Sequence, residues 1–135
     1  MDRPPPTVAE LKALAKSVSE NAYSPYSKVK VGAVVVDDRG RTYCGCNLES
    51  ASYGLTQCAE RNALGAAIAA GVAPGRLHTL LVYAEGFEAL SPCGACRQVM
   101  SELLAPDATV ISCGNDDVLQ TWKISSLFPD PFILE

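Results

Sequence analysis

Three cysteines and one glutamate occur at a spacing that suits a metal-dependent reaction on water. Cys58 lies two residues before Glu60, and Cys93 and Cys96 lie three residues apart further along the chain. Three thiolates fill three positions of a tetrahedral metal site and leave one open, as catalytic zinc sites do, whereas structural sites usually close all four. Glu60 would lie beside a water at the open position. The set therefore predicts zinc chemistry on water.

The cysteine spacing also places the thiols at the starts of helices. Cys93 and Cys96 follow Pro92, a residue that suits a helix start, and residues three apart on a helix have Cβ atoms roughly 5–6 Å from one another. Zn–S bonds of about 2.3 Å are compatible with that separation. Cys58 opens another predicted helix. The positive end of a helix dipole lowers the pKa of a thiol there, so two helix starts facing one ion form a coherent site.

Two charged residues next to the first cysteine have predicted roles. Glu60 can accept a proton from water, pass it to a substrate nitrogen, and then carry another proton to the leaving group. Zn²⁺ with three thiolates carries a net negative charge, and we hypothesise that Arg61 offsets it by donating a hydrogen bond to a ligand sulfur. The alternatives are an ordinary helix-start carboxylate for Glu60, a surface residue for Arg61, and buried or redox-active thiols for the cysteines.

Hydrophobic periodicity and turn residues indicate the elements that position these residues. Thr7 and Glu10 have the spacing of a capping box, and Gly71 is placed to end a helix. The predicted order is a helix over 8–21, strands over 29–36 and 41–46 joined by a turn at 37–40, a loop over 47–57, a helix over 58–70, a strand over 77–83, a helix over 93–104, a strand over 108–113 and a short strand at 122–124. Strands that alternate with helices predict a sheet covered by helices, with the first pair antiparallel and later strands mixed or parallel.

Composition narrows the class of protein. A chain of 135 residues suits one domain, here residues 1–135, in which the proline-rich residues 1–6 form a flexible tail. The net charge of −4 and the lack of a Lys/Arg cluster argue against a nucleic-acid partner. No apolar run approaches the ~20 residues of a membrane span, and the first residues lack the layout of a secretory signal. The chain has six cysteines, and those at metal-ligand spacing are better interpreted as ligands than as members of a disulfide framework, so we expect a cytoplasmic protein.

Several stretches, in order along the chain, resemble the small, homotetrameric, three-cysteine zinc type of cytidine deaminase. The Cys-Ala-Glu-Arg stretch together with Pro-Cys-Gly-x-Cys-Arg-Gln is the specific pair, since a Cys-x-x-Cys alone would be weak. The matching stretches are residues 26–28, 31–33, 45–49, 51–56, 58–61 and 91–98.

The resemblance implies a three-layer α/β/α fold with a mixed central sheet of about five strands, Zn²⁺ bound by the three cysteines, and a proton-carrying Glu60. It implies hydrolytic deamination at C4 of cytidine and deoxycytidine in pyrimidine salvage, by a homotetramer with shared active sites. It also implies that Asn47 and Glu49 hold the ribose hydroxyls and that Ala59 contacts the substrate. Tyr53 and Phe132 are expected to reach the pocket of a neighbouring subunit.

Two residues depart from the pattern of that family. Val29 stands where most relatives have a phenylalanine that walls the base pocket, and Ser50 stands where most have asparagine. Neither belongs to the zinc set. Cys44, Cys46 and Cys113 are expected to be small packed side chains in strands.

Other functions share parts of the pattern. Blasticidin S deaminases carry the same zinc motif, but the Asn47 and Glu49 pair favours an ordinary nucleoside. Editing of nucleic acid is disfavoured by the acidic balance of the chain. A non-catalytic zinc-stabilised module would not need Glu60 beside Cys58.

Overall fold

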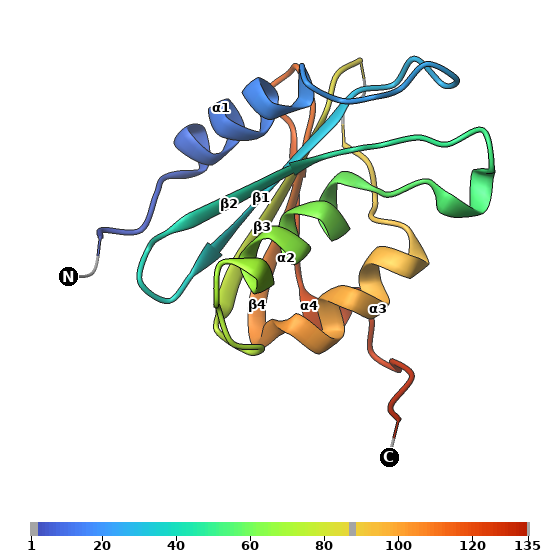
Figure 1. Cartoon of the computed structure of the whole chain (residues 1–135). Coiled ribbons are helices and arrows are strands. Elements are labelled where there is room, and N and C mark those ends of the chain that lie inside the picture. Colours follow the sequence, from blue (N-terminus) through green and yellow to red (C-terminus); the bar gives the residue numbers. More distant parts are fainter. Residues whose placement is uncertain (1–2, 87–88, 135) are drawn as a thin grey trace.

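A five-stranded mixed sheet in the order β2-β1-β3-β4-β5 lies at the centre of the structure (Figure 1). The structure is a computed structural model and describes residues 3–86 and 89–134. β1 is antiparallel to both β2 and β3, β3 is parallel to β4, and β4 is antiparallel to β5. The prediction of a mixed sheet of about five strands is confirmed. The strands are β1 (Val31–Asp37), β2 (Thr42–Cys46), β3 (Leu77–Ala84), β4 (Leu104–Cys113) and β5 (Leu119–Lys123).

Helices cover both faces of the sheet and make three layers (Figure 1). Along β1, Val34 and Val36 face the core under α1, while Ala33 and Val35 face the core under α2 and α3. This alternation is the period of two that a strand buried on both faces must show. Across the two described ranges, every helix falls short of the length and apolarity that a membrane crossing demands. The helices are α1 (Val8–Ser19), η1 (Tyr53–Leu55), α2 (Ala59–Ala69), α3 (Gly94–Leu103) and α4 (Ile124–Leu127).

The first helix begins as the sequence predicts and buries a narrow stripe. Thr7 accepts a hydrogen bond from the Glu10 amide at 3.1 Å, and the Glu10 carboxylate accepts one from the Thr7 amide at 3.4 Å, so the capping box is present. Leu11 and Ala15 are buried, whereas Leu14 is 39% exposed. The helix therefore contacts the sheet along one row of small and branched side chains.

Two glycines allow helices to approach the sheet closely. A Cβ atom at Gly32 would lie 1.9 Å from the Ala15 carbonyl oxygen of α1. A Cβ atom at Gly45 would lie 2.3 Å from the Ala63 amide nitrogen of α2. Both distances are far below ordinary contact, so these positions in β1 and β2 fix how near α1 and α2 can lie to the sheet.

The C-terminal elements differ from the prediction. β4 begins at Leu104, directly after α3, rather than at Ala108. β5 ends at Lys123, and Ile124 begins the unpredicted helix α4, in which Ile124 and Leu127 are buried in the core. Four of the five residues of β5 are exposed, so the strand carries little hydrophobic signal. The helical burial of Ile124 replaces the strand pairing that its β-branched side chain suggested.

Candidate active site

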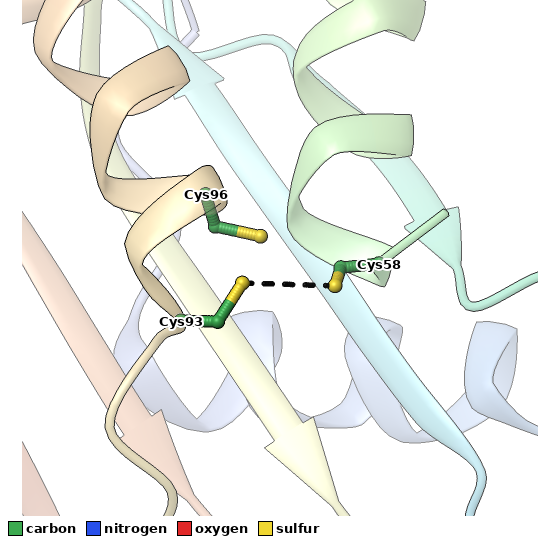
Figure 2. A group of neighbouring side chains, drawn as sticks. All are labelled: Cys58, Cys93 and Cys96. Atoms are coloured by element: carbon green, nitrogen blue, oxygen red, sulfur yellow. Dashed lines mark hydrogen bonds between the residues drawn. The ribbon is translucent and has the colours of Figure 1, made fainter. Parts of the chain in front are cut away.

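The three predicted thiols come together between the starts of α2 and α3 (Figure 2). Their sulfur atoms all lie within 4.8 Å of one another, and the Cys58 and Cys93 sulfurs are 3.9 Å apart. Zn–S bonds of about 2.3 Å in a tetrahedral site require sulfurs a little under 4 Å apart. The donor set and its spacing therefore fit one zinc ion.

Helix geometry makes these thiols available to a metal. Cys58 is the N-cap residue of α2 and Cys93 is the N-cap residue of α3, and neither side chain caps its own helix. Cys96 lies in the first turn of α3 and is buried. The positive ends of both helices favour thiolates at this point. The two helix starts therefore bring their thiols to one point, as the sequence predicts.

The Cys58 thiol has a depressed pKa for reasons visible in its contacts. Hydrogen bonding with Cys96, and with Arg61, whose Nη2 lies 3.4 Å from the Cys58 sulfur, outweighs partial burial and lowers the pKa of Cys58 to about 5. Hydrogen bonding to Cys58 raises the pKa of Cys96, because one thiol of the pair donates to the other. Zinc binding needs every ligand thiol deprotonated, and a divalent cation favours that state.

Arg61 is held in the position that the charge-balance hypothesis requires. The bond from its Nη2 to the Cys58 sulfur is present. Its Nε is buried, and within the described part of the chain this atom has no hydrogen-bond partner. The bond from Nη2 to the Cys58 sulfur therefore directs the guanidinium toward the thiol cluster.

Glu60 lies on the first turn of α2 with its side chain buried. It is 6% exposed, and burial raises its pKa above the ordinary value of a glutamate. A carboxyl whose pKa is raised toward neutrality exchanges protons more readily than an exposed one. The environment of Glu60 therefore suits a proton carrier and does not match the solvated helix-start carboxylate considered as the alternative.

A cavity of about 300 Å³ opens beside the thiols and Glu60. Its walls combine a mainly aliphatic side with a few polar groups, which is the usual character of a small-molecule site. Val29, the residue that departs from the family pattern, forms part of the wall. The lining residues are Ser27, Val29, Val31, Asn47, Thr56, Gln57, Cys58, Ala59, Glu60, Val82, Leu90, Ser91 and Cys93.

A second, more open cavity of about 420 Å³ shares Ser27 and Thr56 with the first. Glu49 and Tyr53 line this second cavity, together with Ser50. The shared residues place the two cavities side by side. A ligand with two chemically different halves can therefore place one half beside Glu60 and the other beside Glu49.

Asn47 and Glu49 are both fixed by bonds to the chain itself. Asn47 Nδ2 donates to the Val29 carbonyl at 2.8 Å, and its Oδ1 accepts from the Val31 amide at 2.9 Å. Glu49 accepts from the amides of Tyr26 and Ser27, at 3.0 and 3.1 Å, and from the Ser27 hydroxyl. These bonds, chiefly the one from the Ser27 hydroxyl, lower the pKa of Glu49 below its ordinary value.

The remaining predicted site residues occupy different environments. Ala59 is buried and lines the 300 Å³ cavity. Tyr53 is 81% exposed at the mouth of the second cavity, and Phe132 is 70% exposed near the C-terminus. Phe132 therefore does not cap the core of its own chain. Ser50 keeps a role in its loop, because its amide donates to Thr56 Oγ1 and its hydroxyl accepts from the Ser52 amide.

Comparison with known proteins agrees with this geometry. Residues 7–113 match the family model described as the cytidine and deoxycytidylate deaminase zinc-binding region. The chain belongs to this deaminase family. A cytidine deaminase of Halalkalibacterium halodurans is 41% identical over 116 residues, which cover 86% of each chain. One of Sporosarcina psychrophila is 37% identical over 128 residues, which cover 95% of this chain and 93% of the relative.

Solved structures extend the likeness to three dimensions. The crystal structure of a cytidine deaminase from Burkholderia pseudomallei superposes with a TM-score of 0.90 and 44% sequence identity, and covers 94% of this chain and 100% of its own. The chain is therefore a zinc enzyme of the deaminase class with the fold of that class. Zinc is its cofactor, and the Cys58, Cys93 and Cys96 cluster is able to hold the ion.

Sequence reasoning missed several residues of this deaminase site. Ser27, Thr56 and Ser91 line the main cavity, and each lies within a stretch that carried the family resemblance. Their position within those stretches was a signal that could have identified them. Leu90 had no such signal, because nothing in the sequence indicates that the segment before Cys93 folds back over the cavity.

Proposed function

We propose that this deaminase hydrolyses cytidine and deoxycytidine to uridine and deoxyuridine and serves pyrimidine salvage. One observation carries the proposal: a buried Glu60 and two of three clustered thiols line the same cavity. The named relatives are cytidine deaminases, at 37% and 41% identity over most of the chain. The acidic balance of the chain supports a free nucleoside rather than nucleic acid as substrate.

The proposal gives each protein group at the metal a task. Cys58, Cys93 and Cys96 hold Zn²⁺, which when bound lowers the pKa of water and so supplies a nucleophile at neutral pH. Glu60 takes a proton from water and delivers it to N3 of the cytosine ring, and then carries a second proton, from the hydroxyl that water has added at C4, to the departing amino group, which leaves as ammonia. Arg61 offsets the negative charge of the ligand thiolates.

The two adjoining cavities suit the two halves of a nucleoside. We place the base among the aliphatic residues beside Glu60, with Ala59 in contact, and the sugar toward Asn47 in the wall of that cavity and Glu49 in the second cavity. The Glu49 carboxylate is an acceptor for ribose hydroxyls, and the three hydrogen bonds that fix it hold it in one orientation. Such fixed acceptors reduce the entropy lost when a substrate binds.

We further propose a homotetramer with shared active sites. The exposed side chains of Tyr26 and Tyr53 line the open cavity, and the exposed Leu48 and Leu55 adjoin its lining residues Glu49 and Thr56 in the sequence. An apolar surface of this kind beside a site is typical of a protein interface. Tyr53 and Phe132 would then reach the pocket of a neighbouring subunit and supply the aromatic faces that the aliphatic cavity lacks among its described lining residues.

We also propose a cytoplasmic location and a single domain spanning residues 1–135 with a flexible 1–6 tail. The six cysteines are free thiols, and a reducing compartment keeps ligand thiols available. The one sheet, with a core on each face, supports a single domain.

Purified protein incubated with cytidine, deoxycytidine and blasticidin S tests this function. We expect loss of the cytosine absorbance and release of ammonia with both nucleosides. We expect Glu60→Gln to retain one zinc per chain and to lose about 10²–10⁴-fold in turnover. Turnover of blasticidin S alone would identify the antibiotic deaminase instead. Full activity of Glu60→Gln would contradict the proton-carrying role.

A further inference from the structure

The segment that leads into α3 carries a zinc-site cysteine on an exposed stretch of chain. Leu90, Ser91 and Cys93 all line the cavity, yet all three are exposed. This stretch belongs to no helix or strand, so no backbone ladder fixes it. An exposed ligand on such a segment needs side-chain contacts to hold its position.

Ser112 on β4 provides the first of these contacts. Its side chain is buried at 1% exposure. Its hydroxyl both donates a hydrogen bond to Leu90 and accepts one from it. Ser112 Oγ donates to the Leu90 carbonyl at 2.6 Å and accepts from the Leu90 amide at 2.8 Å. The hydroxyl thereby replaces a strand partner and joins Leu90 to the sheet.

Arg97 on α3 provides the second contact, immediately before the ligand. Its Nε donates to the Pro92 carbonyl at 2.7 Å, and its Nη2 donates to the Ser91 hydroxyl. Its Nη1 donates to the Leu127 carbonyl at the end of α4 at 3.1 Å. The planar guanidinium thus joins three points of the chain at once, in a fork that the single ammonium of lysine cannot reproduce.

The bond from Arg97 to the Leu127 carbonyl connects the thiol cluster to the C-terminal segment. The next residue, Gln98, continues this connection, because its side chain donates to the Phe132 carbonyl at 2.9 Å and accepts from the Phe132 amide at 3.0 Å. The end of α4 and the C-terminal segment are therefore held against the start of α3. The orientation of the Pro92 peptide, and with it the position of Cys93, depends on this set of bonds.

We propose that Arg97 is a positioning residue that holds Cys93 in metal-binding geometry by fastening the 91–92 segment to the end of α4. The proposal rests on the proposed role of Cys93 as a zinc ligand. Arg97 is not itself a member of the thiol cluster or of the main cavity lining, and it acts on Cys93 through the Pro92 carbonyl and the Ser91 hydroxyl. Its loss should therefore change how long zinc is retained before it changes the fold.

The test compares zinc release from the loaded protein in Arg97→Gln, Arg97→Lys and wild type. Transfer of zinc to a chromogenic chelator gives the release rate, and the thiolate-to-cobalt absorption of the Co²⁺ form reports the ligand geometry. Arg76→Gln is the matched control, because Arg76 also pairs with oxygen atoms, at 2.7 Å to Asp38, but its side chain is 57% exposed and remote from the thiols. Thermal unfolding measures any global loss of stability.

We expect Arg97→Gln to release zinc about 10–100-fold faster and to shift the cobalt spectrum. Arg97→Lys should recover part of the retention, and Arg76→Gln should match wild type. If Arg97→Gln does not fold, Arg97→Lys decides the question alone. Release within twofold of wild type in every folded Arg97 variant would overturn the inference. Cys93→Ser separates the two proposals: fast release from it together with slow release from the Arg97 variants rejects only this inference, and slow release from it rejects the ligand set.

Discussion

Three residues close together at the start of α2 need different states of ionisation. The proposed reaction requires that Cys58 is ionised, that Glu60 exchanges a proton, and that Arg61 stays charged. Hydrogen bonds lower the pKa of Cys58, while burial raises the pKa of Glu60. Opposite shifts in adjacent acidic groups are typical of sites that separate ligand and acid–base roles. The N-terminal turn of the helix makes this possible, because it directs Cys58 toward α3 and Glu60 into the cavity.

Arg61→Gln tests the balance of charge. The substitution removes the positive charge and the 3.4 Å bond to the Cys58 sulfur. We expect turnover to fall about 10–100-fold while one zinc remains bound. Because Arg61 helps to lower the pKa of Cys58, zinc loss on acidification should occur at a higher pH in the variant than in wild type. Metal analysis and steady-state kinetics across a pH series measure both effects.

Unchanged turnover and an unchanged pH of zinc loss would remove Arg61 from the site. Arg76→Gln serves as the control for loss of a positive charge from this acidic chain. It should leave both quantities at their wild-type values.

At the residue scale, the sequence predicts the metal cluster better than the substrate contacts. A tetrahedral metal site and the turn of a helix together restrict how its cysteine ligands can be spaced. The sulfur atoms of Cys58, Cys93 and Cys96 lie close together as this spacing predicts. Asn47 was predicted to bind ribose, and its side-chain atoms bond to Val29 and Val31 in the structure. Its sugar contact stays a prediction. Long-range partners such as the Pro92 carbonyl for Arg97 depend on the fold and leave no trace in local spacing.

At the element scale, close packing of α2 on β2 sets the position of the first ligand. Gly45 lies against the backbone of α2, and Gly32 lies against the backbone of α1 on the opposite face. The two glycines thus make similar contacts, but only α2 carries a thiol of the cluster. Substitution of each glycine therefore gives a matched pair of variants, one on the face whose helix carries a thiol and one on the face whose helix does not.

Gly45→Ala should displace α2, and Gly32→Ala should displace α1. We expect each to lower the free energy of unfolding by about 1–3 kcal/mol or more, because added atoms in a packed interior force backbone shifts. Only Gly45→Ala should also accelerate zinc release, since Cys58 moves with α2. Chemical denaturation and chelator assays measure the two effects. Equal zinc release from both variants would show that the position of α2 does not control the site.

The end of β1, where the chain turns into β2, carries a carboxylate that should make the stability of the fold depend on pH. Burial alone would raise the pKa of Asp37, but bonds from the Arg41 and Arg39 amides and from the Tyr43 hydroxyl, all at 2.9 Å, lower it below the ordinary 3.8. The unfolded state therefore binds a proton more readily than the folded state. The carboxylate stabilises the fold fully above pH 3.8, and this stabilisation is lost as the pH falls through the lower folded-state pKa.

Asp37→Asn should cost about 1–3 kcal/mol of unfolding free energy at neutral pH. The difference from wild type should be constant from about pH 6 to 8 and should shrink below the ordinary aspartate pKa. Urea unfolding across this range measures it. A difference that stays constant into strong acid would contradict the role of the charge, and zinc content at neutral pH should not change.

The elements themselves show where sequence reasoning succeeds. The α1 capping box, the β1–β2 hairpin and the Gly71 stop of α2, which has φ of 98°, all follow from local chemistry. β5 and α4 do not, because β5 is largely exposed and α4 has one turn. Both are stabilised by packing against β4 and the core, which no local pattern reports.

At the scale of the whole molecule, two large exposed side chains are predicted to serve a neighbouring subunit. Tyr53 lines the more open cavity and Phe132 lies near the C-terminus, and both are mostly exposed rather than packed in the core of their own chain. If subunits share active sites, an assembly mixed from two variants, each altered at one of two residues, contains some sites in which both residues are intact. Complementation then becomes possible.

Mixing Glu60→Gln with Phe132→Ala tests this sharing. Each variant alone should have low activity, the first through lost proton transfer and the second through weaker substrate binding. Subunits unfolded and reassembled together should recover part of the wild-type activity, because some sites combine an intact Glu60 with a neighbour's intact Phe132. Light scattering gives the subunit number. Activity no higher than the average of the two separate variants would show that each chain completes its own site.

The zinc coordination of the purified protein tests the central claim most directly. X-ray absorption at the zinc edge reports the number and type of atoms around the metal. The account predicts one zinc per chain with three sulfurs at about 2.3 Å and one oxygen or nitrogen at about 2.0–2.2 Å, the latter from solvent. Four sulfurs, or fewer than three, would contradict it.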